Sequence, residues 1–287
     1  MKSKVYFTKN ITSENLVEMY KKLGIELKGN VAVKVHSGEP GGNNFLKPEF
    51  MKQLVEHVNG TIVECNTAYE GRRNTTEKHI KAIEEHGFTK IAKVDIMDSE
   101  GDMELPIKNG KHLTINYVGK HLANYDSILV LSHFKGHQMG GFGGALKNTS
   151  IGIASSYGKA VIHGAGDPKE IWTADQDSFL ESMAEAAGSI MEYRKDKMAF
   201  INVMCNLSID CDCNSCPHEP EMKDIGILAS LDPVALDKAC VDLVYNSKDS
   251  GKASLIKRME EKHGIHIIEE AERLGIGTSD YELIEIA

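Results

Sequence analysis

Four of the six cysteines lie in the stretch CNLSIDCDCNSC, at positions 205, 211, 213 and 216. Cys211, Cys213 and Cys216 form a C-x-C-x-x-C pattern, in which disulfides between neighbours would be strained. A short turn of this kind can instead aim several thiolates at one soft metal. Pro217 follows the last cysteine, as proline does in bacterial ferredoxin cysteine runs. We therefore predict a metal centre here, either an iron–sulfur cluster or zinc.

The sequence does not decide which residue is the fourth metal ligand. Cys205 is the ligand that we place in the set, and His218, Cys65 or an open coordination position are the alternatives. Free thiols without any metal are the other interpretation. Clustered cysteines favour a metal because stable disulfides are rare in the reducing cytosol, where we expect this chain.

The segment SHFKGHQMGGFGGALKN (132–148) follows a strongly apolar strand pattern. It fits neither a P-loop nor the G-x-G-x-x-G dinucleotide pattern. His133 and His137 are candidates for a general base or a metal ligand, and Lys147 for a cation that binds an anion. A tight turn with solvated histidines is the alternative. Backbone N–H groups that approach a bound anion or cofactor are expected at Gly140, Gly141, Gly143 and Gly144.

Two further loops carry polar side chains at predicted strand ends. In VKVHSGEPGGNNF (33–45), His36 and Glu39 are candidate catalytic groups. In ECNTAYEGRRN (64–74), the paired Arg72 and Arg73 suit recognition of a carboxylate or phosphate. His163, after the predicted strand 159–163, completes the catalytic candidates. Each of these groups alone is as readily explained as a solvated loop residue.

Short β-branched segments alternate with helical patterns along the chain. Strands are predicted at 31–36, 61–65, 91–97, 112–118, 127–134, 159–163, 198–205, 224–230 and 281–286, with helices at 47–58, 75–88, 178–194, 232–245 and 253–264. This alternation predicts an α/β fold with Rossmann-like layers, a mainly parallel sheet covered by helices on both faces. Ligands of such sheets bind beyond the carboxyl ends of the strands, where the loops above lie.

Composition limits the function classes. The chain has 287 residues, 33 Lys+Arg against 42 Asp+Glu, and few aromatic residues, so nucleic-acid binding is not expected. No apolar stretch is long enough to span a membrane, and the N-terminus lacks the apolar region of a signal peptide, so we expect a cytoplasmic protein without membrane contact. We expect one domain over 1–287, with two α/β lobes, about 1–195 and 196–287, as the alternative.

These motifs together resemble the family called domain of unknown function 362, whose members are described as uncharacterised iron–sulfur-centre proteins. The resemblance runs from about residue 31 to 246 and includes KVHSGEPG, NTAYEGRRN, LSHFKGHQMGGFGGALKN, CDCNSC and DIGILASLDPVALDKACVDLV. It implies a metal or [4Fe-4S] centre at Cys211, Cys213 and Cys216. Many relatives carry an additional ferredoxin-like segment with further cysteines, and we expect no such segment in this chain. The Gly-rich loop also resembles, distantly, that of nickel-pincer lactate racemases, which would make His133, Lys147 and His163 active-site groups.

Three functions fit these observations. The first is an iron–sulfur enzyme, of redox or lyase/isomerase type, that acts on a small anionic substrate beside a Cys-ligated cluster. The second is a non-enzymatic electron-transfer or cluster-carrier protein with a redox partner. The third is a zinc-stapled hydrolase or binding protein. The first requires the cysteines and histidines to converge at one edge of the sheet.

Overall fold

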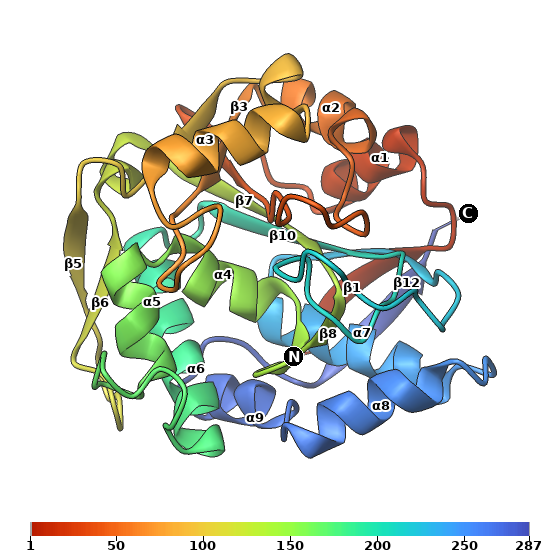
Figure 1. Cartoon of the computed structure of the whole chain (residues 1–287). Helices are drawn as coiled ribbons and strands as arrows, with labels where there is room; N and C mark the ends of the chain where they lie inside the picture. The colour runs from red at the N-terminus through yellow and green to blue at the C-terminus, as the bar shows by residue number, and fades with distance from the viewer. Residues whose placement is uncertain (1, 287) are drawn as a thin grey trace.

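The structure, a computed structural model, describes residues 2–286 and places one large sheet between two layers of helices (Figure 1). Within these residues the sheet has eight strands, and seven of them run in the same direction. The predicted α/β fold with a mainly parallel sheet is confirmed. In order across the sheet, the strands are β12 (Tyr281–Glu285), β1 (Ser3–Thr8), β11 (Gly226–Ser230), β10 (Met198–Met204), β7 (Ser127–His133), β2 (Val31–Lys34), β3 (Gly60–Glu64) and β4 (Val94–Ile96).

Each face of the sheet packs on its own group of helices. On β2, Val31 and Val33 point into one core and Ala32 into the other, as the period of a strand buried on both faces requires. The first core is covered by α1 (Ser13–Lys22), α2 (Pro48–His57) and α3 (Thr76–Glu85). The second is covered by α4 (Ala145–Ile153), α5 (Ser156–His163), α6 (Gln176–Tyr193), α7 (Pro233–Asn246), α8 (Lys252–Glu261) and α9 (His266–Arg273).

One predicted strand is wrong: residues 159–163 belong to helix α5. The Ser155 hydroxyl caps this helix by accepting the Gly158 N–H at 3.0 Å. In a short apolar segment, periodicity does not distinguish a buried strand from a buried helix. Here the Ser155 cap favours the helix. The segment 164–167 therefore follows a helix and not a strand.

The remaining elements are short and lie outside the large sheet. One hairpin consists of β5 (Asp102–Pro106) and β6 (Ile115–Gly119). The Gly-rich segment after β7 forms a second hairpin, β8 (Lys135–His137) and β9 (Gly141–Gly143). Two 3-10 helices, η1 (Phe88–Lys90) and η2 (Lys120–Asn124), complete the elements.

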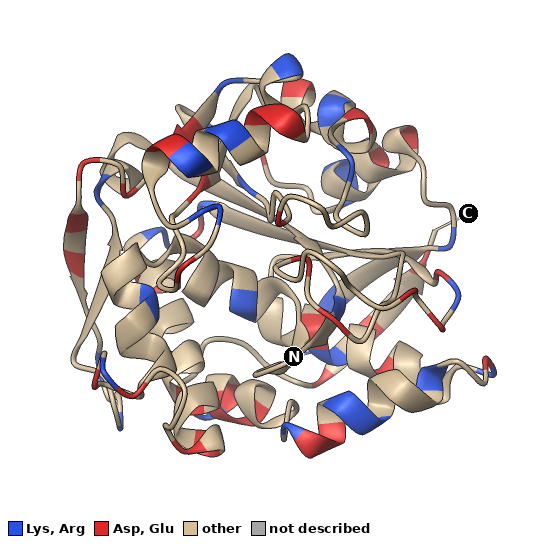
Figure 2. Ribbon diagram, viewed as in Figure 1, with Lys and Arg blue, Asp and Glu red and all other residues tan. Residues whose placement is uncertain are grey.

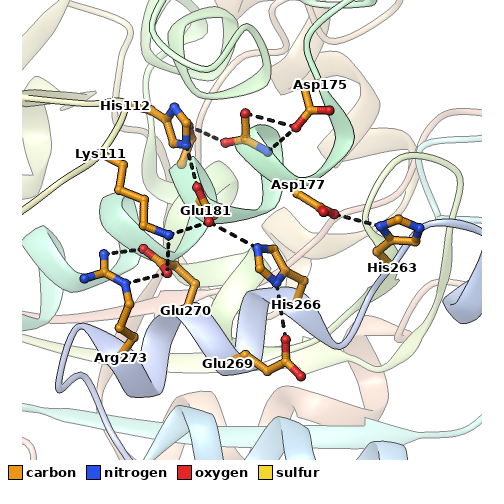
Figure 3. A network of polar contacts seen from close by, with 12 residues as sticks. Lys111, His112, Asp175, Asp177, Glu181, His263, His266, Glu269, Glu270 and Arg273 are labelled. Atoms are coloured by element: carbon orange, nitrogen blue, oxygen red, sulfur yellow. Dashed lines mark hydrogen bonds and ion pairs between the residues drawn. The ribbon is translucent and has the colours of Figure 1, made fainter.

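Charged side chains of both signs are interspersed on the outer helices, for example on α3 and α8 (Figure 2). No helix within residues 2–286 combines the length and the apolar character needed to span a bilayer. A polar network on one side of the molecule joins α6, α9 and the loop between β5 and β6 (Figure 3). At its centre, the Glu181 carboxylate accepts hydrogen bonds from Lys111 at 2.5 Å, His112 at 2.6 Å and His266 at 3.2 Å.

Candidate active site and metal centre

A cavity of about 230 Å³ lies where β2, β3, β7 and β10 end. These strands are parallel, so the loops that follow them emerge at the same edge of the sheet. Helices α4 and α5 close the cavity from the second layer. Ten of the predicted site residues line it, namely His36, Arg73, His133, His137, Gly143, Gly144, Lys147, His163, Cys211 and Cys213.

Two of the four predicted metal-ligating cysteines converge in this cavity. The ligand atoms of Cys211, Cys213 and His137 all lie within 4.8 Å of one another. Two bonds of about 2.3 Å from sulfur to one ion span up to roughly 4.6 Å, so this spacing suits a single soft ion. Cys216 is exposed and Cys205 is half-buried, and neither belongs to this group.

The two thiols share their protons unequally. A hydrogen bond from Cys213 is the main reason that the pKa of Cys211 lies well below its usual value; burial opposes this effect and the charge of Lys135 adds to it. The same interaction, together with burial, raises the pKa of Cys213. The pair therefore presents one thiolate, the form that binds metals, at Cys211.

The cavity histidines differ in the tautomer that their hydrogen bonds select. His137 Nδ1 accepts the N–H groups of Met139 at 3.1 Å and Gly140 at 2.9 Å, which leaves the proton of the neutral ring on Nε2. His36 Nδ1 likewise accepts the Gly38 N–H, and its Nε2 lies 4.0 Å from Cys211 Sγ. In these tautomers both rings are donors toward the thiolate, and His137 would have to release its Nε2 proton to bind a metal there.

His163 has the opposite tautomer. Its Nδ1 donates to the Lys159 carbonyl at 2.7 Å, so the lone pair of the neutral ring is on Nε2. Burial lowers the pKa of His163 to about 3, and the ring stacks on Phe179. His163 is therefore a neutral histidine in the cavity wall whose Nε2 has no hydrogen-bond partner within residues 2–286, available to accept a hydrogen bond from a ligand or to bind a metal.

His133 has no free ring nitrogen. Its Nδ1 contacts the Asp212 carboxylate at 2.9 Å, and its Nε2 donates to the Cys205 carbonyl at 2.6 Å. Lys135 also pairs with Asp212 at 2.8 Å, and all three charged side chains are buried. Burial alone would lower the pKa of His133, but the Asp212 carboxylate outweighs burial and raises it to about 9. This ion triad fixes the cysteine loop to the end of β7.

Two lysines in the cavity have no carboxylate partner within residues 2–286. The side-chain amine of Lys147 makes no hydrogen bond or ion pair in that part of the chain, and Lys159 Nζ donates only to the carbonyls of Ala154 at 2.6 Å and Cys65 at 3.3 Å. Burial lowers the pKa of both. Other cavity cations are paired, Lys34 with Glu64 at 2.7 Å, for example. The cavity therefore has an excess of positive charge in a protein of net charge −9.

The glycines and arginines that we expected to bind a ligand make other contacts in the structure. The N-terminal N–H groups of α4 do not face a free anion site, because Ala145 and Leu146 donate to the Asp237 carboxylate at 2.7 and 2.9 Å. Gly144 lies against the same carboxylate, which leaves no room for a Cβ. Gly140 donates to His137 instead of a ligand, and Gly141, with φ +75°, packs on Gly264.

The arginine pair is divided between the surface and the interior. Arg72 forms an exposed ion pair with Glu85 at 2.9 Å. Arg73 is buried in the cavity wall and donates to Glu39 at 2.6 Å. Glu39 therefore supports Arg73 from behind and does not itself line the cavity.

Several cavity residues were not expected from the sequence. Lys34 lies in the buried segment VAVK of β2, where a charged residue between valines is the signal that identifies it. Lys159 and Asp212 carry no comparable signal, because their partners are distant in the sequence. Lining residues of this kind are Lys34, Lys135, Lys159 and Trp172.

The family of the chain follows from a sequence comparison. The family model "Domain of unknown function (DUF362)" matches residues 31–242. This chain belongs to the DUF362 family. The matched region includes every strand and loop that forms the cavity of this DUF362 protein, from His36 to Cys213.

Solved structures similar to this DUF362 protein include two from thermophilic bacteria. The lactate racemase apoprotein from Thermoanaerobacterium thermosaccharolyticum shares 15% identity at a TM-score of 0.49, over 83% of this chain and 56% of that chain. A Thermotoga maritima protein shares 15% identity at a TM-score of 0.46, over 91% of this chain and 58% of that chain. The chain thus spans a little over half the length of both. No curated protein matched the sequence.

Proposed function

We propose that the cavity is an enzyme active site in which a small anionic substrate binds beside a metal held by Cys211 and Cys213. One observation carries this proposal: the converging thiols lie in the same cavity as two lysines without carboxylate partners within residues 2–286. Unpaired buried charges lower stability, and they are typical of sites that bind an oppositely charged ligand.

The donor set fits one soft metal ion. Two thiolates and a nearby imidazole suit zinc or iron, and such an ion would supply a Lewis acid or, with iron, an electron. A [4Fe-4S] cluster, which the family resemblance implies, takes four ligands. It would need Cys205 and Cys216 to join Cys211 and Cys213 by a rearrangement of the loop. We keep the cluster as the second form of the proposal, and the test below separates the two.

The chain's own residues divide the remaining tasks. Lys147 and Lys159 attract the negative group of the substrate. His163, with its unprotonated Nε2, is positioned to accept a hydrogen bond from a bound molecule. The buried triad of His133, Lys135 and Asp212 holds the cysteine loop in place.

The first test is the metal content of protein purified without oxygen. Iron, sulfide, zinc and nickel are measured together with visible absorption in the natural sequence, in Cys213→Ala and in Cys216→Ala. A single ion predicts one metal per chain without sulfide, lost in Cys213→Ala and kept in Cys216→Ala. A four-ligand cluster predicts matched iron and sulfide with broad visible absorption, lost in both variants. Absence of any metal in the natural protein would overturn the proposal.

A further inference from the structure

We infer that the substrate carries a flat apolar group beside its negative charge, and that Tyr69 and Trp172 form the wall that receives this group. The inference deepens the proposed function and rests on it. It starts from two aromatic residues of the cavity lining that belong neither to the metal-ligating group nor to the ion pairs.

Trp172 is the single tryptophan of the chain and one of its most exposed large apolar side chains, with 68% of its surface accessible. A lone exposed aromatic residue needs no explanation by itself. Trp172, however, lines the cavity and forms a tilted ring pair with Tyr69, with centroids 6.0 Å apart. Contact with a ligand would cover the largest apolar surface in the chain that folding leaves open.

Tyr69 connects this aromatic pair with the metal centre. It lines the same cavity and is half-buried. It shares the cavity lining with Cys211 and Cys213, and its ring pairs with that of Trp172. Tyr69 therefore links the exposed Trp172 to the cavity wall that carries the thiols. Ala68, Met139 and Ile151 add apolar surface to the cavity.

The size of the cavity limits the flat group. Its volume is about 230 Å³. Since a dry apolar cavity of about 150 Å³ already binds benzene, the space suits one ring with a short acidic group. The substrate class that fits is a small carboxylate with one aromatic or similarly flat substituent.

The single tryptophan makes this inference directly measurable. Protein purified without oxygen is titrated with phenylacetate, acetate and the neutral phenylacetamide, and Trp172 fluorescence and calorimetry are recorded. We expect phenylacetate to change the fluorescence and to bind at least about tenfold more tightly than acetate, because the ring covers aromatic surface. We expect phenylacetamide to bind at least about tenfold more weakly than phenylacetate, because it lacks the charge that the lysines attract.

Variants separate the aromatic wall from other effects. Trp172→Ala should reduce the preference for phenylacetate over acetate to about threefold or less, and Trp172→Phe should keep most of it, both by calorimetry. Tyr157→Ala is the matched control, because Tyr157 is an aromatic residue 49% exposed that lies outside the cavity. It should leave both affinities unchanged.

The outcomes distinguish the two proposals. Equal affinities for acetate and phenylacetate, or a preference that survives Trp172→Ala, would overturn the aromatic wall and leave the anion site standing. Equal affinities for phenylacetate and phenylacetamide would overturn the anion site. Binding of none of the three compounds would overturn both.

Discussion

Two groups of charged side chains in this protein have different surroundings: the network between α6 and α9, and the cavity at the strand ends. In the network, Glu181 and Glu270 together accept hydrogen bonds from Lys111, His112, His266 and Arg273 (Figure 3). Every cation at its centre faces a carboxylate. In the cavity, Lys159 is buried and Lys147 is half-buried, and neither faces a carboxylate within residues 2–286.

The difference separates a structural from a functional use of charge. Paired charges that are half-exposed hold elements together at small net gain. Unpaired buried charges cost stability and persist where a ligand supplies the counter-charge. The triad at Asp212 is a third case, because it lies beside the cavity yet is fully paired and buried. The following predictions test this comparison.

The largest expected effect is from Asp212→Asn. It leaves two buried cations, His133 and Lys135, without their carboxylate, and we expect a loss of about 3–5 kcal/mol in the free energy of unfolding. Urea denaturation at pH 7 measures it. A loss below about 1 kcal/mol, the size expected for an exposed pair, would show that the triad is not desolvated as described.

The second prediction concerns alkaline pH. The His133 ring, with a folded pKa of about 9, contributes stability fully below about pH 6.5, the pKa of an unfolded histidine, and that contribution is lost as the pH rises through about 9. Urea denaturation between pH 6 and pH 10 should therefore show a decline of up to about 3 kcal/mol from this group. The decline should be smaller in Asp212→Asn. Equal declines in both proteins would contradict the pairing.

Lys147→Met should change stability and binding in opposite directions. Removal of a half-buried amine without a carboxylate partner should raise the free energy of unfolding by about 1 kcal/mol. The same change should weaken phenylacetate binding by about tenfold, because a charge-assisted contact is lost. Thermal denaturation and calorimetry give the two values. A loss of stability would mean that Lys147 has a partner that makes it structural.

The smallest effect is expected from Glu181→Gln in the network. Burial alone would raise the pKa of Glu181. The hydrogen bonds from Lys111, His112 and His266 outweigh burial, and they lower this pKa to about 2. Its contribution is present above about pH 4.3 and is lost as the pH falls through about 2. At pH 7 we expect the variant to lose about 1 kcal/mol and to bind phenylacetate unchanged. Weaker binding would remove the distinction between the two regions.

Local signals in the sequence were sufficient for most of the fold. Asp232 caps α7 and Pro233 begins it, as the local pattern predicts, and the strands at 127–134 and 198–205 are β7 and β10 within a residue or two. The first function required the histidine and cysteine loops to converge, and the parallel sheet brings them to one edge because parallel strands end there together. The prediction of a strand at 159–163, which belongs to α5, was wrong because the apolar residues there suit either a strand or a helix.

The partners of individual side chains were beyond local signals. Asp237 occupies the N-terminus of α4 although 91 residues separate it from Leu146, and Asp212 pairs with His133 across 79 residues. Such contacts depend on how helices and loops pack, which no spacing within one segment records. For the same reason the sequence did not show that His133 is bonded on both ring nitrogens while His163 keeps one free.

The position of β1 in the sheet has a consequence for biosynthesis. β1 lies between β11 and β12, where Tyr6 pairs with Ala229 and Ser3 pairs with Tyr281. The first strand to be synthesised can therefore pair with its neighbours only after the last strands have been made. The strands β2, β3, β4 and β7, with Lys34 and His133, leave the ribosome long before Cys211. During synthesis, therefore, the residues of the cationic half of the cavity leave the ribosome before the cysteines, and the cavity is complete only after the cysteine loop has followed them.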